Sequence, residues 1–259
     1  MKFKVLTLFP ENLKSSLDYG VIGRAQKQNI IDIEYINPRD YSDNNYGSID
    51  DKPYGGGPGM VIKADPLLKA IEFAKGGTSE ICPVVFLSPQ GLLFNQKKAE
   101  SYAKLKDLIL VSGRYEGIDE RVIELTENAL EISLGSFVMS GGEIAASAMI
   151  DSITRLIPGA LGHEMSALQD SFTEDLLDYP HYTRPELFRN ISVPKVLVSG
   201  NHHEINRWRL KQALGRTYQR RPNLLEQRQL SDDETVLLEE YQEELDRKST
   251  RLNSSHVLI

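Results

Sequence analysis

Four glycine-bearing segments of the sequence lie where main-chain groups could contact a ligand. The glycines of KPYGGGPGM (52–60) permit positive φ angles and a close approach of the backbone to a bound molecule. SPQG (88–91) and GRYEGIDER (113–121) each follow an apolar run that predicts a strand, and SLGSFVMSGGE (133–143) leads into a predicted helix. Main-chain N–H groups at the start of a helix can bind a ligand directly.

Each segment also has a purely structural interpretation. KPYGGGPGM alone is typical of a flexible surface loop, and the Gly141–Gly142 pair suits a tight turn equally well. Asp119 is well placed to cap the helix predicted after it. Two of the segments follow strands, which favours a ligand site, because open α/β sheets bind ligands at the carboxyl ends of parallel strands.

Several familiar sites are not visible in the sequence. No GxGxxG follows a predicted strand, and no Gly-Lys-Ser/Thr follows the glycine-rich segment, so Rossmann and Walker motifs are not visible. One cysteine and five scattered histidines offer no zinc-ligand spacing. No nucleophile elbow of a serine hydrolase appears. The sequence therefore predicts no conventional dinucleotide, metal or serine-nucleophile site.

The elements that position these segments alternate along the first part of the chain. Apolar, β-rich runs bounded by turn residues predict buried strands, and the stretches between them have helical character. Strands are predicted at 3–9, 83–88, 108–113 and 129–139 (the last running into a loop), and helices at 63–75, 94–106, 119–128 and 143–157. This alternation predicts an α/β fold with a parallel sheet.

The second part of the chain is predicted to be mainly helical. NHHEINRWRLKQALGRTYQRR forms one basic helix with a break at Gly215, and Ser231 and Glu234 form a capping box for a second helix. Residues 249–259 do not continue that pattern. We therefore expect an α/β domain over 1–160, a flexible linker over 161–175, a helical domain over 176–247 and a tail over 248–259.

The net charge of −7 hides a basic block beside an acidic one. Arg184 to Arg221 contains nine Lys or Arg and two acids, whereas Glu226 to Asp246 contains nine acids and one base. A basic block is the footprint of a phosphate-backbone partner, although a solvated helix face explains it equally well. The single cysteine favours a cytoplasmic location. No signal peptide is visible, and no apolar run approaches the ~18 residues of a membrane span.

Taken together and in order, seven blocks resemble the bacterial tRNA (guanine-N1)-methyltransferases and cover roughly residues 1–245. They are KPYGGGPGM, LSPQG, GRYEGIDER, SGGE, GHE followed by DSF, LLDYPHYTRP and SGNHHEINRWRLKQALGRT. The resemblance implies a trefoil-knotted α/β methyltransferase domain of the SPOUT class, although knots are otherwise nearly absent from folds. It also implies a homodimer with active sites at the subunit interface.

The resemblance further implies S-adenosyl-L-methionine as the methyl donor. Phe86 departs from the family pattern, where Tyr is usual, and Ser136 stands where an acid or Asn is common. The first change removes a hydroxyl group, and the second puts a polar role there in doubt. The resemblance permits magnesium, but no site for it is visible. The implied cofactor residues are Phe86, Leu87, Pro89, Gly91, Gly113, Tyr115, Glu116, Ser133, Leu134, Gly135, Met139, Gly141 and Gly142.

The implied target is the guanosine at tRNA position 37, just 3′ of the anticodon. N1 of guanine carries a proton at neutral pH, so methylation there needs a general base. Negative charge develops toward O6 as the proton leaves, so a cation or N–H donor should lie there. The resemblance assigns these roles to Asp170 and Arg155. It implies tRNA contacts at Gly59, Ser166, Asp178, His181, Tyr182, Arg184, Arg207, Arg209 and Lys211.

Other interpretations of these residues stay open from the sequence. Arg155 could form a helix-surface pair with Asp151, and Asp170 could be a helix cap or a solvated linker acid. Trp208 is more typical of a core residue than of a base-stacking one. Another knotted RNA methyltransferase is disfavoured by Asp170 and the HYTRP block, and a non-catalytic RNA-binding protein by the presence of both Asp170 and Arg155.

Overall fold

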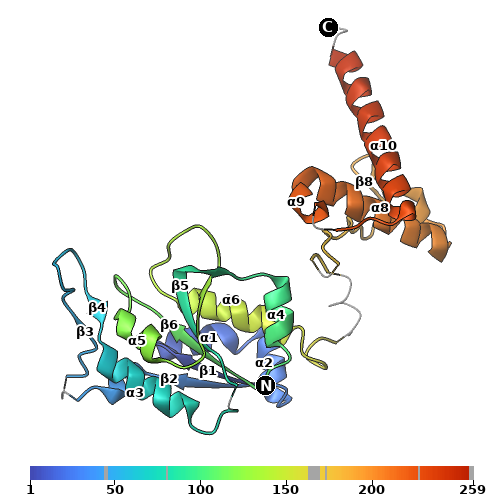
Figure 1. Cartoon of the computed structure of the whole chain (residues 1–259). Helices are drawn as coiled ribbons and strands as arrows, with labels where there is room; N and C mark the ends of the chain where they lie inside the picture. Colours follow the sequence, from blue (N-terminus) through green and yellow to red (C-terminus); the bar gives the residue numbers. More distant parts are fainter. Residues whose placement is uncertain (44–45, 80, 163–169, 173, 227, 257–259) are drawn as a thin grey trace. The chain divides into compact units, whose positions relative to one another are not determined.

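The computed structural model describes residues 1–259 except 44–45, 80, 163–169, 173, 227 and 257–259, and for 248–256 it describes the backbone only. The chain divides into two compact units, Met1–Ala167 and Leu168–Ile259 (Figure 1).

A five-stranded parallel sheet forms the centre of the first unit. Its strand order is β2-β1-β6-β5-β7, and every neighbouring pair is parallel. The expected α/β fold with a parallel sheet is therefore confirmed. The strands are β1 (Lys2–Leu6), β2 (Asp32–Ile36), β5 (Val84–Leu93), β6 (Asp107–Ser112) and β7 (Ala129–Ser133).

Helices cover both faces of this sheet (Figure 1). Successive side chains of β5 alternate between the two faces, so Val85 and Leu87 join one core cluster while Val84 and Phe86 join the other. On the first face lie α1 (Pro10–Leu17), α2 (Gly20–Lys27), α4 (Gln96–Tyr102) and α6 (Glu143–Thr154); on the second lie α3 (Ala64–Lys75) and α5 (Glu120–Leu125).

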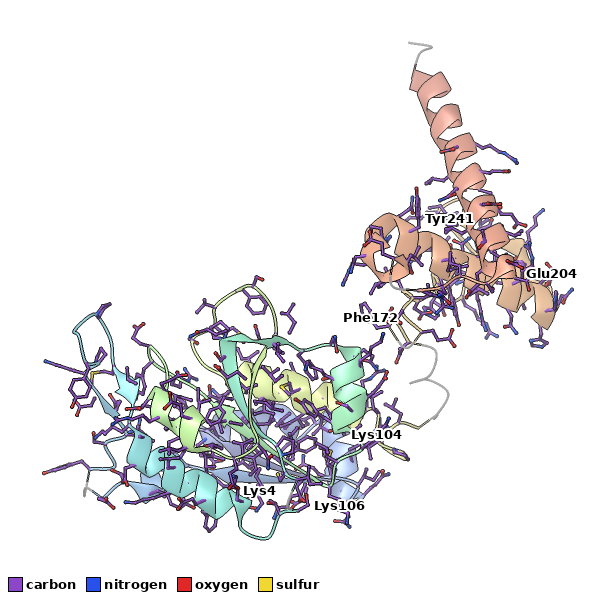
Figure 2. All side chains as sticks on the ribbon, in the orientation of Figure 1. Lys4, Lys104, Lys106, Phe172, Glu204 and Tyr241 are labelled. Carbon is purple, nitrogen blue, oxygen red and sulfur yellow. The ribbon has the colours of Figure 1, made fainter. Side chains whose placement is uncertain are left out.

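A buried lysine joins the sheet to α3. Lys4 of β1 is 5% exposed, and its ammonium donates hydrogen bonds to the carbonyls of Ala74 at 2.6 Å and Gly76 at 2.8 Å (Figure 2). These carbonyls lie at the end of α3, where a helix lacks internal donors and carries partial negative charge. The lysine therefore satisfies the helix end and fixes it to the strand.

The glycine-rich segment 52–60 lies between two short strands of an antiparallel pair, β3 (Asp50–Asp51) and β4 (Val61–Ile62). A short 3-10 helix, Pro38–Tyr41, precedes it. Gly55, Gly56, Gly57 and Gly59 all have positive φ angles, as this sharply curved connection requires.

SPQG (88–91) was expected to follow a strand that ends at residue 88, and this expectation was wrong. These residues lie inside β5, which pairs with β7 up to Leu87, shifts register, and resumes pairing at Leu92. Such an irregularity inserts unpaired residues into a strand without ending it. A proline and a glycine in the sequence therefore marked a disturbed strand and not its end.

The second unit contains a short hairpin, β8 (Leu187–Phe188) with β9 (Ile191–Ser192), and a 3-10 helix, Lys195–Val198. Its long helices are α8 (His202–Arg220) and α10 (Asp232–His256), joined by the short α9 (Pro222–Leu225). The predicted capping box is confirmed, because Ser231 Oγ accepts from Glu234 N and Glu234 Oε2 accepts from Ser231 N.

Two helix boundaries in this unit differ from those expected. The break predicted at Gly215 was wrong: α8 continues through this residue, where a side chain would lie 2.3 Å from the Tyr241 ring of α10 (Figure 2). The glycine thus permits close packing of two helices. α10 also continues into the expected tail, as far as His256, because no proline or glycine ends it.

Candidate active site

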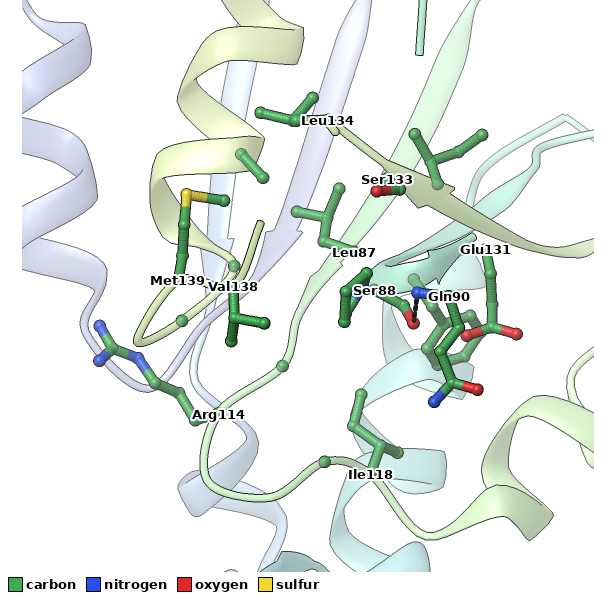
Figure 3. Close-up of a pocket in the computed structure, with 18 of the residues that line it drawn as sticks. Leu87, Ser88, Gln90, Arg114, Ile118, Glu131, Ser133, Leu134, Val138 and Met139 are labelled. Carbon is green, nitrogen blue, oxygen red and sulfur yellow. Dashed lines mark hydrogen bonds between the residues drawn. The ribbon is translucent and has the colours of Figure 1, made fainter. Parts of the chain in front are cut away.

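The carboxyl ends of β5, β6 and β7 surround a pocket of about 320 Å³ (Figure 3). In this view Leu87 lies near the centre, Val138 and Met139 lie at one side, and Gln90 and Glu131 lie at the other. The volume falls within the usual size of small-molecule sites, about 300–1,000 Å³. The position agrees with the rule that parallel sheets bind ligands at the carboxyl ends of their strands.

The structure brings together almost all of the residues expected to bind a cofactor. Twelve of the thirteen line this pocket: Phe86, Leu87, Pro89, Gly113, Tyr115, Glu116, Ser133, Leu134, Gly135, Met139, Gly141 and Gly142. Gly91 is not among the lining residues. A side chain there would lie 2.3 Å from the main-chain atoms of Glu131 and Ile132, so Gly91 permits the close approach of β5 to β7.

The glycine-rich segment contributes to one wall of the pocket region. Glu116 N donates to the Met60 carbonyl and Ile62 N donates to the Gly117 carbonyl, both at 3.0 Å. A side chain at Gly59 would overlap the carboxylate of Glu116, at 2.4 Å. Gly59, expected to contact the substrate, therefore lies directly against a pocket-lining side chain.

Internal hydrogen bonds shape the 133–142 segment. Gly135 N donates to Ser133 Oγ at 3.2 Å, and Gly142 N donates to the Gly113 carbonyl at 2.9 Å. The main-chain N–H of Gly142 thus joins two loops, which favours the structural interpretation of the Gly141–Gly142 pair over the ligand-binding one. The expected helix position itself is confirmed, because Gly142 is the N-cap of α6.

Two residues near the pocket have clear structural roles. Phe86 is 1% exposed and packs in the core cluster against α3, so the hydroxyl that a tyrosine would carry there is replaced by apolar packing. Asp119 caps α5 by accepting from Arg121 N, as the structural interpretation predicted. The Arg121 side chain donates to the same carboxylate and holds the pKa of Asp119 below its usual value.

Sequence reasoning missed several pocket residues. Gln90 lies in the disturbed part of β5, and Ile118 enters the wall because it pairs with Ile62 of β4. Glu131 offered a detectable signal, because it is an acid within the otherwise apolar strand β7. Glu131 is half-buried and joins Glu116 and Glu120 as the third acid in the pocket lining.

The two expected catalytic residues belong to different units. Arg155 is the C-cap of α6 in the first unit. Asp170 begins the described part of the second unit, and Ser166 lies outside the described residues. The next residue, Ser171, accepts a hydrogen bond from Asp178 N at 2.9 Å. Asp170 therefore directly precedes a residue that is hydrogen-bonded to Asp178, one of the residues expected to contact tRNA.

Polar and aromatic side chains form that cluster in the second unit. Asp178 Oδ2 lies 2.7 Å from His181 Nε2, and the Tyr182 and Trp208 ring centroids lie 6.4 Å apart. The Arg209 guanidinium lies 4.9 Å from the centroid of the Tyr179 ring. Trp208 is half-buried against Tyr182 and is not a fully buried core residue. Arg184 is exposed, and the peptide bond between it and Pro185 is cis.

The remaining expected tRNA contacts are paired with α10. Arg207 donates to Glu240 at 2.5 and 3.1 Å, and Lys211 donates to Glu244 at 2.7 Å. The Arg207 guanidinium holds the pKa of Glu240 below its usual value, and Glu240 in turn raises the pKa of Arg207. The acidic block therefore neutralises part of the basic block within the same unit.

The described residues contain no group of three or more His, Cys, Asp or Glu arranged to hold a metal ion. In the same part of the chain, no helix has the length and apolar character needed to cross a membrane.

Comparisons with known proteins agree with this arrangement. A family model described as tRNA (Guanine-1)-methyltransferase TrmD matches residues 1–227. A tRNA (guanine-N(1)-)-methyltransferase from Hahella chejuensis is 58% identical over 238 residues, which is 92% of each chain. Proteins of the same name from Photorhabdus laumondii and Shewanella sediminis are 54% and 52% identical, covering 93% and 94% of this chain and 96% and 100% of their own. The chain therefore belongs to the tRNA (Guanine-1)-methyltransferase family.

Proposed function

We propose that this protein transfers a methyl group from S-adenosyl-L-methionine to N1 of guanosine at position 37 of tRNA. The observation that carries the proposal is the convergence of twelve expected cofactor residues on one pocket at the carboxyl ends of three strands. Family membership supports the reaction class, and the names of the relatives support guanine N1 as the acceptor.

The residues present fit this cofactor. Leu87, Ile118, Leu134 and Met139 offer apolar surface for an adenine ring, and Ser133 and Glu116 offer polar groups for its ribose and amino acid parts. Side chains at Gly141 and Gly142 would overlap Arg114 and the Ser112 backbone, so glycines at these positions let the pocket wall pack closely against β6 and the segment that follows it. When bound, the cofactor supplies an electrophilic methyl group.

In the proposed reaction, Asp170 accepts the N1 proton of guanine and Arg155 stabilises the charge that develops toward O6. The pocket loops align the methyl group with the nucleophile, which is the other large contribution expected for a transfer reaction. The hydrogen bond between Ser171 and Asp178 N supports this assignment, because it joins the neighbour of Asp170 to the substrate cluster.

The proposal includes a homodimer in which each active site contains residues of both subunits. Exposed apolar side chains support it: Phe137 at 56% and Val138 at 85% exposure line the open side of the pocket, and Ile144 at 66% exposure lies on α6 outside the lining. The trefoil knot is likewise proposed, and membership of the family whose resemblance implied it supports it. Sedimentation analysis tests the dimer, and a crystal structure traced through residues 84–154 tests the knot.

The experiment that tests the function is transfer of labelled methyl from S-adenosyl-L-methionine to an unmodified tRNA transcript with guanosine at position 37. A matched transcript carries adenosine there. We expect label only on the first transcript, at N1 of the target base. Label on both would refute the target position, and label on neither, with folded protein and bound cofactor, would refute the reaction.

Neutralising Arg207, Arg209 and Lys211 together is expected to weaken tRNA binding and flatten its salt dependence. Each phosphate that the variant no longer neutralises should reduce the slope of log K against log salt by about 0.9. Binding is measured by filter retention at several salt concentrations, and an unchanged slope would place the phosphate-binding residues elsewhere.

A variant of the acids on α10 tests whether Arg207 and Lys211 are needed for tRNA binding or for packing of the helices. Replacing Glu240 and Glu244 by Gln removes the negative charges that pair with Arg207 and Lys211 and leaves both cations in place. This variant should bind tRNA at least as tightly as the unmodified protein, because the freed cations can contact phosphates. Weaker binding would indicate that the ion pairs serve only to pack α8 against α10.

A further inference from the structure

A buried carboxylate beside the pocket takes no part in the proposed chemistry. Glu143 begins α6, and its side chain is 8% exposed. It accepts hydrogen bonds from Thr7 Oγ1 at 2.9 Å and from Arg114 Nε at 3.0 Å, and Arg114 Nη2 lies 2.9 Å away. Burying a carboxylate costs free energy unless hydrogen-bond donors surround it. The three donors here therefore hold the Glu143 carboxylate in one arrangement.

The carboxylate joins three segments that are distant in sequence. Thr7 follows β1, is 1% exposed, and its hydroxyl also accepts from Phe9 N at 3.0 Å. Arg114 lies in the segment after β6, and Glu143 starts the helix after the 133–142 segment. A single side chain therefore fixes the loops that follow two neighbouring strands to the start of α6.

Arg114 extends this network to the pocket. Its Nη1 donates to the Ser140 carbonyl at 3.1 Å, and its guanidinium lies 4.6 Å from the centroid of the Phe9 ring. A side chain at Gly141 would lie 2.2 Å from Arg114 Nε, so the guanidinium lies against this loop. Figure 3 shows Arg114 beside the segment that carries Val138 and Met139. Ser140 and Gly141 both line the pocket.

We propose that Glu143 is a positioning residue for cofactor binding. With Thr7 it fixes the guanidinium of Arg114, and Arg114 then holds the Ser140 carbonyl and Gly141 in the wall of the pocket. Glu143 acts through these residues and does not contact the reacting groups. The inference rests on the proposed function, because the ligand whose affinity it sets is S-adenosyl-L-methionine.

The test is the affinity of Glu143→Gln for S-adenosyl-L-methionine, measured by calorimetry. The amide retains an acceptor for Thr7 but loses the charge that pairs with Arg114. We expect the Kd to rise about tenfold, equivalent to about 1.4 kcal/mol. The KM for the cofactor should rise in parallel, whereas kcat at saturating cofactor should change much less. If Glu143 had only a structural role, the substitution would lower the Tm without raising the KM more than it changes kcat.

Glu34→Gln is the matched control. Glu34 lies on β2 of the same unit, pairs with Lys2 at 2.8 Å, and is not among the pocket-lining residues. The control makes the same chemical change at this position. Its Kd should equal that of the unmodified protein. Thr7→Val and Thr7→Ser give a second test if Glu143→Gln fails to fold: the valine should raise the Kd and the serine, which keeps the hydroxyl, should not.

A double-mutant cycle with Arg114→Met decides whether Glu143 acts through Arg114. Residues of one network give non-additive effects, so Glu143→Gln should add little to the Kd of Arg114→Met. Additive losses, or an unchanged Kd in Glu143→Gln, would overturn the inference. An unmodified protein that binds no S-adenosyl-L-methionine would overturn the proposed function instead, so the two failures are distinguishable.

Discussion

Asp170→Asn is expected to reduce kcat by about 10²–10⁴-fold, the contribution typical of a general base. The asparagine has nearly the same shape but cannot accept the N1 proton of guanine. The cofactor pocket is lined by residues of the first unit, whereas Asp170 belongs to the second, so binding of S-adenosyl-L-methionine should stay close to that of the unmodified protein. Single-turnover methyl transfer with saturating tRNA measures the chemical step directly.

Asp233→Asn is the control for this substitution. It makes the same change at an exposed residue in the first turn of α10, within the same unit. Its rate should match that of the unmodified protein. Wild-type turnover in Asp170→Asn would contradict the base assignment, and a parallel loss in cofactor affinity would show that the change disturbs the fold instead.

The buried strands were predictable because their own apolar, β-rich residues indicate a strand without reference to distant parts of the chain. The runs at 3–9, 83–88 and 108–113 are apolar on both faces, as strands covered by helices on each side must be. β2 was not predicted, because DIEYI places acids at an edge of the sheet, where Asp32 and Glu34 pair with Lys2 of the neighbouring strand. Its strand character depends on a partner that is distant in sequence.

The pocket was predictable in position and in part of its composition. Segments that follow strands of one parallel sheet emerge at the same edge, and β6 and β7 both neighbour β5, which is why the 113–121 and 133–143 segments line a common cavity. The roles of Glu143 and Arg114 could not be predicted, because they depend on Thr7, more than a hundred residues away in the sequence. Likewise, the basic block gave no indication that Arg207 and Lys211 pair with α10.

Gly91→Ala is expected to destabilise the first unit and to abolish cofactor binding. The new side chain would lie 2.3–2.6 Å from the main-chain atoms of Glu131 and Ile132, and backbone cannot rotate aside as a flexible side chain can. β5 and β7 must therefore separate near the register shift, where Leu92 pairs with Ile132 and Leu93 with Ser133. Forcing extra atoms into a packed interior costs about 1–3 kcal/mol.

Gly91→Ala distinguishes a role in strand spacing from direct binding of the cofactor by the Gly91 backbone. Each kcal/mol lowers the Tm by about 2–4 °C in a unit of this size, so the unfolding temperature should fall measurably. Gly162→Ala, whose side chain would meet no atom within 4 Å, should leave the Tm unchanged. If Gly91 instead binds the cofactor directly through its backbone, Gly91→Ala would lose affinity at an unchanged Tm. A loss of both, as we expect, identifies Gly91 as the residue that sets the spacing of the strands around the pocket.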